Sequence, residues 1–272
     1  MRVTCLLLCL SLVQPLAAQQ VSPATPQQIA TLPSQRDPLA VAALQSAHAS
    51  LGGASQALPV SLSASGTHTD FATSSPPSYP IRIMALGTTK IRWETDLPSG
   101  TVVSIIRGRR GWTQDTDGIT ALSVGRTVGQ GVENFPLLAF ANWANLPNVL
   151  VKLVGPETLD GAKVVHVSLT ESGDPSATPD SEKILRTARQ CELYIDQQTN
   201  LPVRLRYFES LGDWRRSIPV DLAFSNYKSV GGFLFPFTLT RYRAGQLSDQ
   251  TQLSSVVFNQ PLSDDLFWVN QP

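Results

Sequence analysis

Ser225 and Lys228 are the residues whose types and spacing most directly suggest catalysis. A serine followed three positions later by a lysine is a signature of serine acyl-transfer enzymes, in which the serine starts a helix and both side chains share one face. Residues 220–227 instead have strand-like alternation, and strand positions three apart point to opposite faces. The companion motifs S-D-N and K-T-G are missing from the sequence. We therefore predict that the protein is not an enzyme.

The remaining reactive residue types do not form a metal or cofactor motif. His48, His68 and His166 lack metal-ligand spacing, and there is no H-E-x-x-H sequence. Residues 115–118, Asp-Thr-Asp-Gly, resemble part of a calcium loop but lack its spacing and its closing Glu, so they predict a hairpin turn. The sequence contains no G-x-S-x-G motif and no phosphate-binding glycine loop. We predict no metal site, no cofactor and no catalytic residue.

The N-terminus has the features of a secretory signal peptide. Arg2 is a lone positive residue, residues 6–13 are a short apolar run, and residues 15–18 end in small side chains. This pattern predicts a signal peptide over residues 1–18 and a periplasmic or secreted protein. The apolar run is too short for a transmembrane helix, and no later segment is long and apolar enough, although an uncleaved anchor is the alternative interpretation. Cys9 comes too early for a lipoprotein cleavage site.

The exported chain is nearly neutral and has one cysteine. Without the signal peptide it contains 20 Lys and Arg residues against 21 Asp and Glu residues, which gives no indication of a nucleic-acid partner. Cys191 is then the only cysteine, so no intramolecular disulfide can form. Low charge and 20 prolines are typical of a turn-rich β protein. Stability must therefore come from the core of one large domain, which we place at residues 37–272.

Two helices and a polar leader interrupt the strand pattern. Residues 19–36 are rich in Gln, Pro, Ser and Thr, and we expect a disordered leader there. Asp37 and Pro38 have the types preferred at a helix start, which predicts a helix over residues 37–51. A second helix is predicted over residues 134–145. That helix is apolar on nearly every side, so it must be buried or must cover an apolar surface.

Most other segments show the period-two alternation of strands. Residues 60–69 are expected to form a weak, polar strand at an edge, and residues 171–181 a long exposed loop. Residues 81–86 and 90–96 are expected to form a hairpin. The other predicted strands are residues 101–106, 149–154, 163–169, 193–196, 201–207, 220–227, 233–240 and 252–258.

Three segments in the C-terminal third carry turn and strand signatures of a known family. They are residues 194–203, with Tyr-Ile-Asp followed by Leu-Pro-Val, residues 226–236, with Gly-Gly before Phe-Leu-Phe-Pro, and the closing residues 257–267. Together they resemble the LolA/LolB-like superfamily, which includes periplasmic carriers that sort outer-membrane lipoproteins. The resemblance implies a mainly β fold, an open curved antiparallel half-barrel with a few helices covering its concave face. It also implies a cavity for acyl chains between sheet and helices.

The aromatic and apolar residues of the second helix and of the sheet are the candidates for that cavity, although the same pattern also fits plain core packing. We predict a periplasmic carrier or binding protein for a lipid, a lipoprotein acyl chain or another apolar ligand. Envelope proteins are further candidate partners. The alternative is a non-transporting envelope sensor or protein-interaction module on the same fold. The predicted cavity residues are Trp93, Phe135, Leu138, Phe140, Trp143, Phe233, Phe235 and Phe237.

Overall fold

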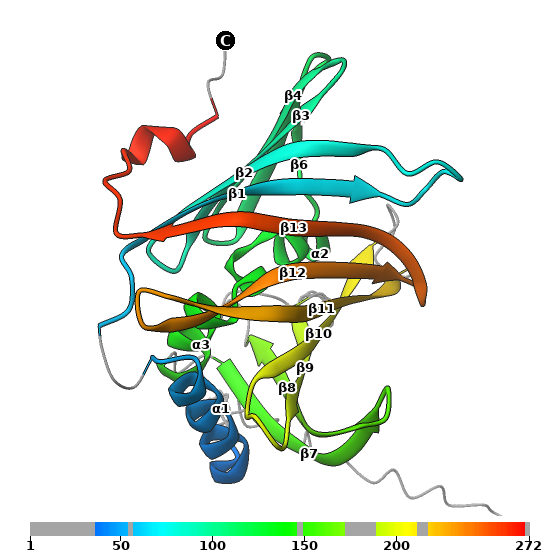
Figure 1. The fold of residues 1–272 in the computed structure, drawn as a ribbon. Coiled ribbons are helices and arrows are strands. Elements are labelled where there is room, and N and C mark those ends of the chain that lie inside the picture. Colours follow the sequence, from blue (N-terminus) through cyan, green and yellow to red (C-terminus); the bar gives the residue numbers. More distant parts are fainter. Residues whose placement is uncertain (1–35, 54–56, 146–148, 172–188, 211–216, 270–272) are drawn as a thin grey trace, which may run out of the picture. The chain divides into compact units, whose positions relative to one another are not determined.

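The computed structural model describes residues 36–53, 57–145, 149–171, 189–210 and 217–269. Thirteen strands in these residues form a single sheet, and each strand runs antiparallel to its neighbours (Figure 1). The strands are β1 (Ser61–Asp70), β2 (Ser78–Leu86), β3 (Lys90–Leu97), β4 (Gly100–Arg107), β5 (Arg110–Asp115), β6 (Gly118–Ala121), β7 (Val149–Leu159), β8 (Ala162–Glu171), β9 (Gln190–Asp196), β10 (Pro202–Ser210), β11 (Ser217–Val230), β12 (Phe233–Arg243) and β13 (Gln246–Phe258).

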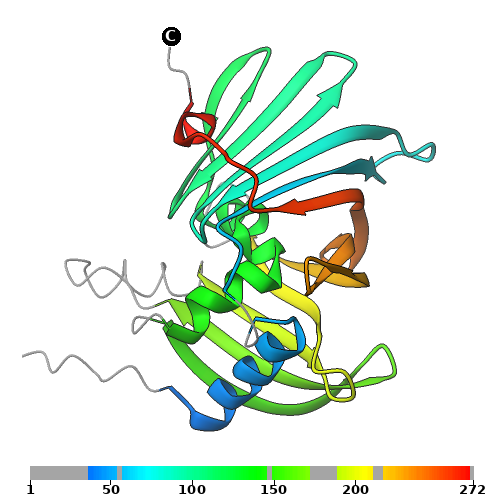
Figure 2. The same cartoon turned by 60° about the vertical axis from the view of Figure 1, so that its left-hand side comes forward.

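The sheet is open rather than closed into a barrel. Its order is β6-β5-β4-β3-β2-β1-β13-β12-β11-β10-β9-β8-β7, so β6 and β7 are its two edges. Figure 2 shows that the sheet bends around the helices, which lie on its concave side. The predicted fold class, an open curved antiparallel sheet with a few helices, is confirmed. Ser225 and Lys228 lie in a strand, as the alternation predicted.

Three α-helices and two short 3-10 helices complete the described residues. They are α1 (Pro38–Ser50), α2 (Val124–Gln130), a 3-10 helix (Val132–Asn134), α3 (Pro136–Asn145) and a second 3-10 helix (Asp264–Phe267). Asp37 caps α1 as predicted, because its side chain accepts a hydrogen bond from the backbone N–H of Leu39. None of the helices among the described residues combines the length and the apolar composition needed to cross a bilayer.

The sequence-based prediction failed for α2 and for the position of β1. Helix α2 contains Gly125 and Gly129, which are poor helix formers, so its local sequence gives little sign of a helix. Strand β1 was expected at an edge but lies between β2 and β13. Its pairing with β13, for example Leu62 with Phe258, joins positions far apart in the sequence. Local alternation contains no information about such a partner.

Several predictions concern residues that the structure does not describe. The signal peptide at residues 1–18 and nearly all of the leader at residues 19–36 lie outside the described residues, as does most of the loop predicted over residues 171–181. Arg36, the last leader residue, forms a parallel bridge with Val151 of β7. The predicted domain limits stay predictions.

An aromatic stack connects the helical segment to the sheet. The Phe135 ring stacks between two others. Its centroid is 5.3 Å from that of Phe235 on β12 and 5.7 Å from that of Trp93 on β3. The indole N–H of Trp93 also donates a hydrogen bond to the backbone oxygen of Gln130 at 2.7 Å. These contacts bury a large apolar area between two distant strands and the segment that follows α2.

Arg241 of β12 provides a second, polar connection between the helical segment and the sheet. Its guanidinium group forms an ion pair with Asp249 at 2.5 Å and donates to the backbone oxygen of Gly129 at 2.9 Å. It also donates to the side-chain oxygen of Asn134 at 3.3 Å. The Asn134 amide in turn donates to the backbone oxygens of Gly129 and Gly131. One buried cation therefore holds the end of α2 and the following 3-10 helix against the concave face.

Replacing Arg241 with methionine should lower the free energy of unfolding by about 3 kcal/mol, because Asp249 and the carbonyl of Gly129 then lose a buried partner. Arg82, whose side chain is 53% exposed, provides the control. Arg82→Met should cost less than about 1 kcal/mol. Urea unfolding followed by tryptophan fluorescence measures both values, and equal losses would contradict the anchoring role of Arg241.

Replacing Gly66 with alanine should lower the free energy of unfolding by at least about 2 kcal/mol. Gly66 lies at a bulge in β1, where an added Cβ would be 2.1 Å from the backbone oxygen of Gln252 on β13. Thr67→Ala, at the exposed next position, should cost less than about 1 kcal/mol. Chemical denaturation compares the variants, and a stable Gly66→Ala protein would show that the two strands can separate without cost.

Candidate functional site

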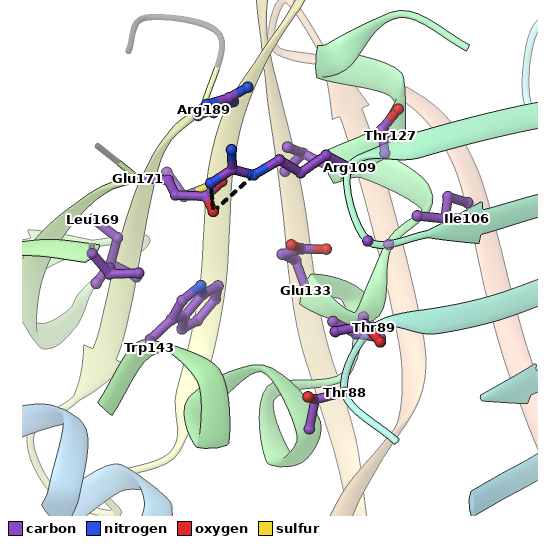
Figure 3. Close-up of a pocket in the computed structure, with 16 residues that line it drawn as sticks. Thr88, Thr89, Ile106, Arg109, Thr127, Glu133, Trp143, Leu169, Glu171 and Arg189 are labelled. Carbon is purple, nitrogen blue, oxygen red and sulfur yellow. Dashed lines mark hydrogen bonds and ion pairs between the residues drawn. The ribbon is translucent and has the colours of Figure 1, made fainter. Parts of the chain in front are cut away.

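A cavity of about 280 Å³ lies between the helical segment, residues 124–145, and two parts of the sheet (Figure 3). We call these parts, β2 to β5 and β7 to β9, the two arms of the sheet. One side comes from the turns after β2 and β4, and the other from β7, β8 and the start of β9. Helices α2 and α3 and the 3-10 helix between them supply the rest of the wall. The lining residues are Thr88, Thr89, Ile106, Gly108, Arg109, Thr127, Val128, Gly131, Val132, Glu133, Trp143, Val149, Leu169, Glu171, Arg189 and Cys191.

The apolar part of the wall is built from side chains that are held by the core. Trp143 of α3 is 8% exposed and meets the fully buried Phe140 edge to face, with the ring centroids 5.7 Å apart. Leu169 of β8 and Val149 of β7 are 2% and 3% exposed. Apart from the indole N–H of Trp143, this surface offers water no hydrogen-bonding group, so it favours a largely apolar occupant.

Charged side chains form another part of the cavity wall. Arg109, in the turn between β4 and β5, donates to one oxygen of Glu171 from two nitrogens, at 3.1 and 2.5 Å. Because Glu171 ends β8, this ion pair connects the two arms of the sheet across the cavity. Gly108 has a φ of +56°, a value that favours glycine and that places Arg109 at the tip of the turn.

Arg189 lies immediately before β9 and also lines the cavity. Its Nη1 atom is buried and has no hydrogen-bond partner among the described residues. Buried polar groups are nearly always hydrogen-bonded, so this nitrogen is an available donor.

Glu133 is a lining residue whose carboxyl group has a strongly raised pKa. The pKa of its carboxyl group is raised to about 7, mainly by burial; a bond from its own backbone N–H lowers the pKa, and the nearby negative charge of Glu171 raises it. The side chain folds back over Gly131, where an added Cβ would be 2.1 Å from Oε2 of Glu133. The carboxyl group is therefore largely protonated below neutral pH.

Cys191 behaves as an apolar wall residue. The thiol is buried, and burial raises its pKa well above its usual value. The negative charges of Glu133, Glu192 and Glu171 raise the pKa further. The thiol therefore stays protonated, and a protonated thiol is a poor nucleophile.

The structure brings one of the eight predicted cavity residues, Trp143, into the wall of this cavity. The others pack in the core, or against it in the case of Trp93, and do not line this cavity. Their proposed contact with a ligand stays a prediction. They are Trp93, Phe135, Leu138, Phe140, Phe233, Phe235 and Phe237.

The charged residues of the cavity were not found from the sequence. Arg109, Glu133, Glu171 and Arg189 come from four separate segments, so no local motif joins them. The one available signal was the turn pattern around Arg109, where glycines at 108 and 111 flank two arginines.

The histidines do not contribute to this cavity. His166 of β8 lies between two carboxylates, with its ring nitrogens 2.7 Å from Glu157 and 2.7 Å from Glu192. Burial lowers the pKa of both His48 and His68. The described residues contain no group of three or more His, Cys, Asp or Glu side chains placed to hold a metal ion. Asp115 accepts from the backbone N–H groups of Asp117 and Gly118, so the predicted hairpin turn is confirmed.

Solved structures give the comparison for this architecture, since neither a protein-family model nor a curated protein matches the sequence. A LolA superfamily protein from Nitrosomonas europaea has a TM-score of 0.57 at 15% identity, covering 85% of this chain and 98% of that chain. A domain from Vibrio parahaemolyticus that is named after outer membrane lipoprotein sorting has a TM-score of 0.55 at 13% identity, covering 84% and 97%. A DUF1329 family protein from Desulfovibrio piger has a TM-score of 0.54 at 12% identity, covering 84% and 96%. The chain therefore has a LolA-like fold, as the resemblance of its C-terminal third predicted.

Proposed function

We propose that the protein binds or carries a lipid, a lipoprotein acyl chain or another apolar ligand in the cell envelope. The observation that carries this proposal is the cavity of about 280 Å³ between helices and concave sheet, with an apolar wall of Trp143, Val149 and Leu169. The predicted signal peptide supports a periplasmic or secreted location. The LolA-like fold and the name of the Vibrio domain support a role with lipids or lipoproteins.

The cavity size is consistent with one ligand chain. A volume of about 280 Å³ equals the liquid volume of roughly nine water molecules and lies at the small end of ligand pockets. Each methylene moved from water into such a cavity contributes roughly 0.8 kcal/mol. A few buried methylenes therefore give measurable affinity and still permit release of the ligand.

Native mass spectrometry of the protein purified from a membrane-containing lysate tests the proposal directly. We expect a bound species whose mass corresponds to a lipid and which is lost on organic extraction. Protein that carries no such species, and that also fails to bind added fluorescent fatty acid, would refute the proposed function.

Trp143→Asp should weaken the binding of a fluorescent fatty-acid analogue by at least about tenfold, because a charge in the wall opposes an apolar ligand. Phe140→Ala is the control, since Phe140 is buried behind Trp143 and does not line the cavity. It should cost about 3–5 kcal/mol of stability and leave the affinity of the folded protein nearly unchanged. Titration and thermal unfolding of the same samples separate the two effects.

A second variant keeps the core intact if Trp143→Asp does not fold. Thr89 is exposed in the turn after β2 yet lines the cavity, so Thr89→Trp should block the cavity with little loss of stability. Thr116→Trp makes the same change in the exposed turn between β5 and β6, away from the cavity, and should leave binding unchanged. Equal affinity of both variants and the original protein would remove this cavity from the proposal.

A further inference from the structure

We propose that the ligand of this cavity is a single-chain amphiphile with an anionic headgroup, which Arg189 binds while the chain lies against Trp143 and Leu169. This inference rests on the proposed function, because it names the ligand class of the same cavity. It adds a headgroup-binding residue and a preference for one sign of charge.

The geometry separates a charged end of the cavity from an apolar one. In Figure 3, Arg189 and Arg109 lie at the same end, beyond Glu171, whereas Trp143 lies toward the opposite end. A ligand with one polar end and one apolar chain matches this division. A purely apolar ligand would leave the buried Nη1 donor of Arg189 without a partner.

The two arginines are not equivalent. Arg109 already forms an ion pair with Glu171, so its charge is largely compensated. Arg189 has no such contact among the described residues, and its side chain lines the same space. An anionic oxygen would accept a charge-assisted hydrogen bond from the guanidinium group, which is stronger than a bond between neutral groups.

The other titratable groups decide whether an anion can enter. The described groups that face this space are Arg109, Arg189, Glu171, Glu133 and Cys191. Cys191 is neutral, and Glu171 is compensated by Arg109. Glu133 is neutral when protonated, and its pKa is about 7 because of burial. Below that pH the described lining carries a net positive charge, and above it the charges balance.

A series of probes with one ten-carbon chain tests the headgroup preference. Decanesulfonate, decanol and decyltrimethylammonium share one chain and carry an anionic, a neutral and a cationic headgroup. Isothermal titration gives each affinity below its micelle concentration or solubility limit. At pH 6 we expect the sulfonate to bind at least about tenfold more tightly than decanol, and the cationic probe more weakly than either. Arg189→Gln should abolish the advantage of the sulfonate and leave decanol binding unchanged, whereas Arg189→Lys should retain part of it.

Arg82→Gln is the matched control, because Arg82 forms its ion pairs with Glu94 and Asp96 on the neighbouring strand β3 and does not line the cavity. It should leave all three affinities unchanged. Equal binding of sulfonate and decanol would overturn the headgroup inference and leave the proposed function intact. Failure of every probe to bind would instead overturn the proposed function. Decanoate and decyl phosphate then distinguish a fatty acid from a phosphorylated lipid, and binding of either more tightly than decanol supports the inference.

The affinity for decanesulfonate should also fall as the pH rises from 6 to 8. The sulfonate stays ionised throughout, while Glu133 loses its proton as the pH passes about 7 and then repels the anion. We expect a loss of about fivefold, no change for decanol, and no pH dependence in Glu133→Gln. An original protein whose sulfonate affinity is constant across this range would show that Glu133 does not face the headgroup.

Discussion

An open sheet of thirteen strands has a concave face that the sheet cannot bury by itself, and this constraint explains the rest of the structure. A barrel fills its interior with its own side chains, but two separated edge strands leave that space to other elements. Here the segment from α2 to α3 covers the face. The stack of Trp93, Phe135 and Phe235 supplies the apolar part of the connection, and Arg241 supplies the polar part.

The cavity lies beside the same anchored segment, because residues of α2 and of the following 3-10 helix form part of its wall. Arg241 fixes the end of α2 and the 3-10 helix to β12. Beyond them, the turns after β2 and β4 face β8 and β9 across a gap that is bridged by the pair of Arg109 with Glu171. A partly exposed ion pair contributes little stability, so it can open at small cost. The cavity is therefore bounded by strong apolar packing on one side and by a weak polar contact on the other.

Much of the local structure could be predicted from the sequence, but little of this site could. Alternation predicted the hairpin of β2 and β3, and the types of Asp37 and Pro38 predicted the start of α1, because both depend on neighbouring residues. The central position of β1 depends on a partner almost two hundred residues away, which no local pattern shows. Trp143 could be proposed because a short helix apolar on every side must cover something. Arg189 could not be proposed from the sequence, because its role as a candidate binding residue depends on its three-dimensional surroundings, including one buried nitrogen without a partner.

In the proposed function, the charges around the cavity would affect both binding and release. A dry wall strengthens every electrostatic contact, so an uncompensated carboxylate there would exclude an anionic ligand. Two features reduce that exclusion. Glu171 is paired with Arg109, and burial raises the pKa of Glu133 to about 7, so that its carboxyl group is largely protonated below neutral pH. The first compensation is fixed by geometry, whereas the second varies with pH and with whatever approaches Glu133. A rise in pH through about 7 ionises Glu133, and in the proposed site its negative charge would then repel an anion held by Arg189. In the proposed site, a change in pH would therefore alter affinity without any movement of the sheet.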